Sequence, residues 1–268
     1  MITLSAIAVS VAGPAAGLAW SEWRRRAVEA QDSRHLAALD SGADEVEWVS
    51  RVAEQVEGCR VSPGLASELG GRGLLPESAV AETRRDGYAE RYMGRPWDDP
   101  ALALGTIGLL IVSLAVAAVT PSLWAVGATS VVGGCAIADW RWRLVPLPLL
   151  AALVACCVGM AAEASAGVTP LVVGLVALAL IEAFRLLAVR ASGSGAFGLG
   201  DVLLLAAVAS ALAVWGGAAP SAFCLALVVE LGCTLLVMRR SKRAGRPVPL
   251  VPFVAPALAV AACAAQLL

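Results

Sequence analysis

Residues 193–208, GSGAFGLGDVLLLAAV, join a glycine-rich loop to the start of an apolar helix. The stretch places one carboxylate, Asp201, where an apolar run begins. An ionised side chain at the centre of a membrane helix costs roughly 2.5 to 3.5 kcal/mol of insertion free energy. An acidic residue so close to an apolar run therefore indicates a structural or a functional role. Asp201 can cap its helix by accepting hydrogen bonds from unpaired backbone N–H groups, or it can act chemically with a second carboxylate at the same depth.

The chain of 268 residues is strongly apolar, with 59% hydrophobic residues and a mean hydropathy of +0.79. Its apolar runs approach the roughly 20 residues that a membrane-spanning helix needs. We therefore predict an all-α, polytopic membrane helix bundle with about eight transmembrane helices. The runs lie at residues 2–20, 101–119, 122–138, 146–162, 168–184, 201–216, 219–237 and 249–267.

A polar segment separates the first apolar run from the others. We predict an N-terminal transmembrane helix at 1–20, a polar cytosolic segment at 21–100 and a seven-helix membrane domain at 101–268. The positive charge follows the first run, at Arg24 to Arg26, whereas a signal peptide carries it before the run. This order predicts a retained helix.

The basic residues predict the orientation, because arginine and lysine collect in short cytosolic loops. If the first helix begins outside, the cytosolic segments hold all twenty basic residues of the chain, and the opposite connections hold none. We therefore expect eight crossings with both chain termini outside.

The number and spacing of the histidine and cysteine residues do not indicate a metal centre. The chain has one histidine, His35, and its seven cysteines form no C-x-x-C pair. We expect no metal, no other cofactor and no disulfide framework. The lipid bilayer is an expected partner, and nucleic acid is not.

Two acids of the apolar region lie on the cytosolic side of their crossings. Asp139 closes the third crossing and Asp201 opens the sixth, so they can meet if those helices pack together. Two close aspartates share one proton, as in aspartic proteases. The ionised member can take a proton from an attacking water while the protonated member donates to the substrate. Gly198 and Gly200 would let an extended substrate backbone approach closely.

The residues around both aspartates resemble motifs of the type IV prepilin peptidases. DWRWRLVP, residues 139–146, is similar to the family's first catalytic motif, an aspartate followed by a basic loop and Ile-Pro-Asn. GLGDV, residues 198–202, is similar to its second motif, Gly-x-Gly-Asp, which other intramembrane aspartyl proteases share. VPLVPFVA, residues 248–255, is similar to the segment that opens the family's last helix.

The resemblance covers about residues 101–268. It implies that Asp139 and Asp201 are catalytic and that Pro146, with the two glycines before Asp201, lies against the substrate. It also implies an aspartyl endopeptidase of the bacterial inner membrane, whose partners are prepilin or pseudopilin precursors with a short basic leader. Many members carry paired C-x-x-C zinc motifs after the first helix. This chain has only Cys59 there, so zinc is not expected.

Two departures from the family keep a second hypothesis open. Leu147 replaces the asparagine of the first motif, and Leu203 replaces the lysine that usually follows the second aspartate by two places. A catalytically silent assembly or transport protein on the same fold would use the aspartates as helix caps or cation ligands. Glu230, in the seventh crossing, has two interpretations as well: it can steer a cationic leader peptide, or it can pair with a structural partner.

Overall fold

The computed structural model describes residues 3–40, 71, 99–142, 144–192, 198–240 and 250–267. Within these residues the chain forms eight helices and no strand, which confirms the predicted fold class. The helices are α1 (Leu4–Asp40), α6 (Pro100–Val119), α7 (Leu123–Trp142), α8 (Leu147–Glu163), α9 (Thr169–Ser192), α10 (Leu199–Trp215), α11 (Ala219–Arg240) and α12 (Val251–Leu267).

The chain divides into two compact units. One unit joins residues 1–18 to residues 104–268 and contains the helix bundle, and the other comprises residues 19–103. Most of the segment predicted to be polar and cytosolic, residues 41–70 and 72–98, lies outside the described residues, and Cys59 lies there too.

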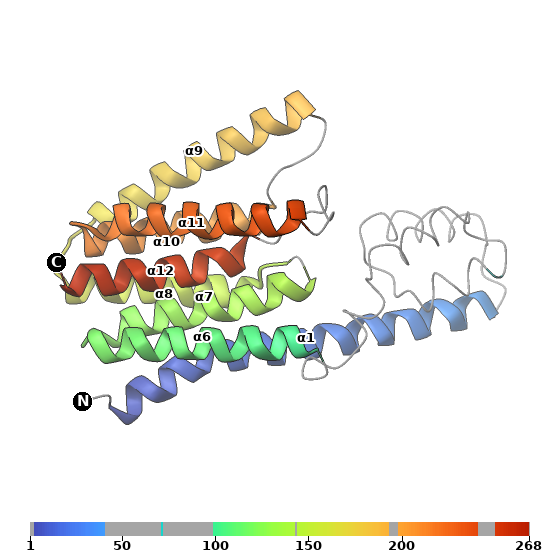
Figure 1. The fold of residues 1–268 in the computed structure, drawn as a ribbon. Coiled ribbons are helices and arrows are strands. Elements are labelled where there is room, and N and C mark those ends of the chain that lie inside the picture. The colour runs from blue at the N-terminus through green and yellow to red at the C-terminus, as the bar shows by residue number, and fades with distance from the viewer. Residues whose placement is uncertain are drawn as a thin grey trace. The chain divides into compact units, whose positions relative to one another are not determined.

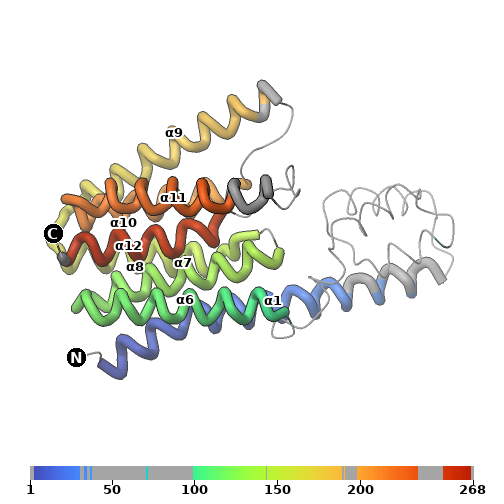
Figure 2. The backbone as a smooth tube through the Cα atoms, in the orientation of Figure 1, coloured from blue at the N-terminus to red at the C-terminus, as the bar shows by residue number. Residues whose placement is uncertain are grey.

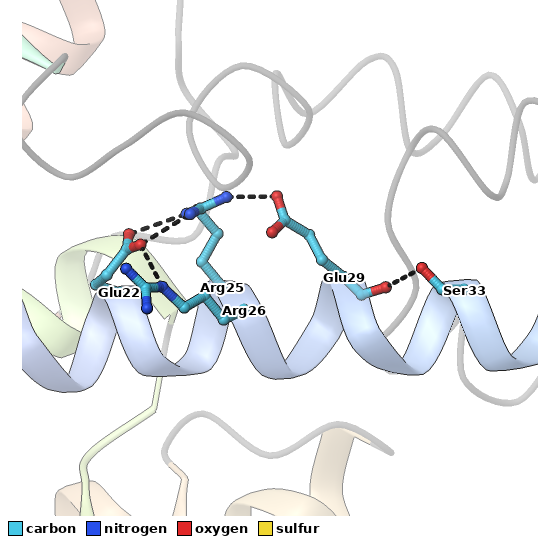
Figure 3. A network of polar contacts seen from close by, with 5 residues as sticks. All are labelled: Glu22, Arg25, Arg26, Glu29 and Ser33. Carbon is cyan, nitrogen blue, oxygen red and sulfur yellow. Dashed lines mark hydrogen bonds and ion pairs between the residues drawn. The ribbon is translucent and has the colours of Figure 1, made fainter.

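Helix α1 does not end with its apolar run at residue 20 but continues to Asp40. Charged side chains pair along this stretch (Figure 3): Arg25 and Arg26 donate to the carboxylate of Glu22 at 2.8 to 2.9 Å, and Arg25 also pairs with Glu29. Ion pairs three and four residues apart stabilise a helix, and residues 21–40 contain neither proline nor glycine. The helix therefore extends beyond the apolar run.

Helices α6 to α12 alternate in direction along the bundle (Figures 1 and 2). Helices α7, α9 and α11 end where α8, α10 and α12 begin, and we call this the aspartate end because it holds Asp139 and Asp201. The described N-terminal and C-terminal residues of the chain lie at the opposite end (Figure 1).

Four helices form the centre of the bundle. Helices α7 and α10 each pack against both α8 and α12, while α9 covers α10, and α11 packs on α12 and α10. The core contains mainly alanine, valine and leucine side chains, including Ala128, Val132, Leu153, Leu204 and Leu258. Large apolar side chains on α6 and α9 are exposed instead, as expected for helices that face lipid.

Among the described residues, four helices are long and apolar enough to cross a membrane: residues 4–30 of α1, all of α6 and α7, and residues 169–188 of α9. Helices α8, α10, α12 and residues 219–234 of α11 are apolar but shorter. A helix of 17 residues, such as α8, is about 25 Å long, slightly less than the hydrocarbon thickness of about 30 Å. The helices identify a polytopic membrane protein.

Helix α1 packs on α7 through a serine that compensates for a proline. Pro14 has no N–H, so the carbonyl of Ser10 loses its donor within the helix. The hydroxyl of Ser130 donates to that carbonyl at 2.9 Å and accepts from the N–H of Gly13 at 3.0 Å. The backbones are so close that a Cβ on Gly134 would lie 2.3 Å from the Gly13 carbonyl oxygen. Small residues thus allow this crossing, as in other membrane helix pairs.

Candidate active site

Asp139 lies in the last turn of α7 and is buried, with 5% of its surface exposed. Its Oδ2 accepts a hydrogen bond from the backbone N–H of Val251 at 3.2 Å. Val251 is the first residue of α12, where backbone N–H groups have no partner within the helix. One oxygen of the Asp139 carboxyl group therefore caps the N-terminus of another helix, at the positive end of that helix dipole.

Asp201 is the third residue of α10 and is partly buried. Its Oδ2 accepts from the N–H of Gly198 at 3.0 Å, which is the contact an acid at this helix position makes in a capping box. Among the described residues this is its one hydrogen bond, so Oδ1 keeps its acceptor capacity. Capping thus uses one oxygen of Asp201, and the other keeps its capacity to accept a hydrogen bond.

The two glycines near Asp201 have different surroundings. Gly198 is exposed, with φ −74° and ψ 160°, and a Cβ there would lie 3.5 Å from Oδ2 of Asp201, an ordinary contact. Gly200 lies against the connection between α7 and α8, where a Cβ would meet the Cβ of Val145 at 3.0 Å. At Gly200 the missing side chain makes room for Val145.

Pro146 is the N-cap residue of α8 at the aspartate end, directly before Leu147. It is buried, its backbone is extended with φ −66° and ψ 128°, and its carbonyl accepts from the N–H of Leu150 at 3.1 Å. A proline suits this position because it lacks the N–H that a helix start leaves unpaired. The next residue, Leu147, is 71% exposed, so the departure from the family motif places an apolar side chain on the surface.

Glu230 lies near the middle of α11, away from both aspartates in sequence and in position along its helix. It precedes Arg240, the last residue of α11, by ten positions, which corresponds to about 15 Å along the helix axis. Its Oε2 is buried and has no hydrogen-bond partner among the described residues. The structure therefore does not group Glu230 with the carboxylates of the aspartate end.

The helices that carry the two aspartates share two neighbours. Helices α7 and α10 both pack against α8 and α12, but the described residues show no extensive packing of α7 on α10, so the meeting of the two carboxylates stays a prediction. Gly200, directly before Asp201, lies against Val145, six residues after Asp139. The same end of the bundle thus carries two carboxylates, each bonded to a backbone N–H of a helix start.

Arginines also gather at the aspartate end. Arg141 is 3% exposed, and its guanidinium carbon lies 5.9 Å from the ring centroid of Trp142. Arg185, in the second half of α9, forms an ion pair with Glu182 at 2.6 Å. The short connections at the opposite end contain no basic residue. Positive charge is therefore concentrated on the side that holds the aspartates.

Two contacts of this site were not predicted from the sequence. The Val251 N–H lies in the segment that resembles the family's last motif, and an unpaired N–H at that helix start was the available signal. Val145 gives no comparable signal, because a valine before a proline occurs in many loops.

The described residues contain no group of three His, Cys, Asp or Glu side chains that could hold a metal ion. The chain matches no family model, no curated protein and no solved structure. The functional interpretation therefore rests on the sequence motifs and on the geometry of the aspartate end.

Proposed function

We propose that this protein is a membrane-embedded aspartyl endopeptidase, with Asp139 and Asp201 as its catalytic pair. Its substrates are precursors similar to prepilins or pseudopilins, which carry a short basic leader before an apolar helix. The proposal combines the resemblance of the two aspartate motifs with one observation: Asp139 and Asp201, 62 positions apart in the chain, belong to the last turn of α7 and the first turn of α10, which lie at the same end of one bundle (Figure 1).

The arginines of the aspartate end support a cytosolic location for this site. Arginine and lysine collect on the cytosolic side of membrane proteins, so the proposed orientation places the aspartates at the inner face and both termini outside. A bacterial inner membrane fits a substrate whose basic leader stays in the cytosol. The scissile bond of such a precursor would lie where the leader meets the membrane, at the depth of the carboxylates.

The reaction we propose is hydrolysis of one peptide bond. The ionised aspartate takes a proton from water as the water oxygen attacks the peptide carbonyl carbon, and the protonated aspartate donates to the carbonyl oxygen. When the tetrahedral intermediate collapses, the C–N bond breaks and the leaving amine takes the proton that the first aspartate received from water. A hydroxyl group of the intermediate returns its proton to the second aspartate, so the product is a carboxylic acid and the pair regains its starting state. The acceptor capacity of Oδ1 on Asp201 and the partial exposure of that residue suit the general base.

The hydrogen bonds of the two carboxylates also favour a second candidate function. Because Asp139 and Asp201 each accept a backbone N–H, a silent assembly or transport protein could retain both residues for capping alone. Asparagine separates the two functions, since its side-chain oxygen still accepts the N–H but cannot exchange a proton.

The test compares alanine and asparagine at each position, with a prepilin-like precursor co-expressed. Asp99 supplies the matched control, because its carboxylate caps α6 by accepting from Ala101 at 2.9 Å and from Leu102 at 3.3 Å. A peptidase loses processing by roughly 10²- to 10⁴-fold with Asp139→Asn or Asp201→Asn, while Asp99→Asn processes normally.

Thermal stability of the purified variants separates capping from catalysis. Each aspartate-to-alanine change, Asp99→Ala included, should cost about 1 kcal/mol of unfolding free energy, and the asparagine variants should cost much less. If Asp139→Asn and Asp201→Asn are stable and still process the precursor, the carboxylates are caps and the peptidase proposal is rejected.

A further inference from the structure

Gly200 occupies a helical position, where glycine lowers the stability of the helix. It lies in the first turn of α10, and a glycine inside a helix destabilises it by comparison with alanine. Its φ is not in the left-handed region, so backbone conformation does not demand glycine there. Space is the remaining reason, because a Cβ would lie 3.0 Å from Cβ, 3.3 Å from Cγ2 and 3.6 Å from N of Val145.

Val145 cannot easily move aside to admit a larger neighbour. Pro146 follows it and restricts its backbone to extended conformations. Its branched side chain has few rotamers and packs against the hydrophobic core of the bundle. A methyl group on residue 200 would therefore displace the start of α10, which carries Asp201 in the next position.

We infer that Val145 is a positioning residue that sets the place of Asp201 relative to the end of α7, and that glycine at position 200 is required for this contact. The inference rests on the proposed function, because it concerns the alignment of the two catalytic carboxylates. A Cβ contact of 3.0 Å is unusually tight, so the groups on its two sides must move apart by a few tenths of an ångström. A misplacement of about 1 Å can lower a catalytic rate by about 100-fold, so this smaller shift predicts a smaller loss.

The test is a steric exchange between positions 145 and 200 in the full-length protein. Gly200→Ala introduces the Cβ contact. Combining it with Val145→Gly removes the opposing Cβ and Cγ2, whereas combining it with Val145→Ala leaves the Cβ in place. Gly108→Ala is the matched control for an added methyl group, since a Cβ there meets nothing within 4 Å.

Two readouts follow each variant. Thermal unfolding tests the contact itself. Gly200→Ala lowers Tm by roughly 2 to 10 °C. Adding Val145→Gly restores the Tm, whereas adding Val145→Ala does not. Cleavage of a precursor tests positioning: Gly200→Ala lowers kcat by roughly 3- to 10-fold with KM unchanged. It also narrows the pH range of activity, because separated carboxylates no longer share one proton. A purely structural contact leaves that pH range as it is.

The outcomes distinguish this inference from the proposed function. If the wild-type chain cleaves the precursor and Gly200→Ala keeps its kcat and pH range, Val145 does not position Asp201 and the inference is overturned. Equal rescue by Val145→Ala and Val145→Gly would also overturn it, because the opposing Cβ would then not matter. A wild-type chain that cleaves no precursor overturns the peptidase proposal itself, even where the Tm values show the contact.

Discussion

Ser130→Ala removes the hydroxyl that joins α1 to α7. Two hydrogen bonds are lost, one to the Ser10 carbonyl at 2.9 Å and one from the Gly13 N–H at 3.0 Å. Ser130 is 1% exposed, so water does not replace them. A net hydrogen bond contributes about 1 kcal/mol in proteins, and bonds between membrane helices average about 0.6 kcal/mol. The expected loss of unfolding free energy is therefore about 1 to 2 kcal/mol.

A double-mutant cycle with Pro14→Ala tests the reason for this loss. The alanine supplies an N–H that can donate to Ser10 within α1, so the carbonyl no longer depends on the hydroxyl of Ser130. In the Pro14→Ala variant, Ser130→Ala should therefore lower the unfolding free energy by about half as much as in the wild-type chain. The difference is a coupling energy of roughly 0.5 to 1 kcal/mol. Thr129→Val is the control, because the Thr129 hydroxyl donates to Ala125 in its own helix.

Thermal unfolding in detergent, followed by tryptophan fluorescence, measures these differences. For a chain of this size about 1 kcal/mol corresponds to roughly 2 to 4 °C in Tm. Equal costs of Ser130→Ala with proline and with alanine at position 14 would refute the claim that the serine compensates for the missing N–H. If Ser130→Ala lowers the unfolding free energy no more than Thr129→Val does, the interhelical role of Ser130 is refuted as well.

Three further predictions concern other helix contacts. Gly159→Ala would place a Cβ 2.2 Å from the ring of Trp124, so we expect a loss of about 1 to 3 kcal/mol and a shift in tryptophan emission; unchanged emission would contradict the contact. Gly174→Ala would place a Cβ 2.1 Å from the hydroxyl oxygen of Ser210 and should lower Tm, and Ser210→Ala should partly restore it if this contact is the cause. Glu182→Gln removes an ion pair at the protein surface and should leave Tm unchanged at moderate salt, where a measurable fall would indicate a stronger pair.

The fold class follows from the sequence because it depends on local properties. Long apolar runs must satisfy their backbone hydrogen bonds internally in lipid, so helices are required. The predicted runs at 101–119 and 249–267 agree with α6 and α12 to within two residues. Asp201 after a glycine-rich loop also predicts a helix start, since an acid in the first turn suits the helix dipole.

The extent of α1 was less predictable. The apolar run ends at residue 20, yet the helix continues for another 20 residues, because side-chain ion pairs and the absence of helix breakers maintain it without an apolar face. Pro14 would suggest a break within the membrane segment, but Ser130 supplies the donor that the helix lacks. A contact between residues 120 positions apart in sequence thus supports a local conformation.

By itself the sequence determined an all-helical membrane protein and two carboxylates on one side of it. Only the tertiary structure decided their surroundings: Asp139 accepts the Val251 N–H, and the start of α10 lies against Val145. The physical reason is that helices in lipid are apolar around most of their circumference, so the sequence pattern does not show which face meets a neighbour. Close packing of small residues and the need to pair buried polar groups select the neighbours, and both depend on the assembled bundle.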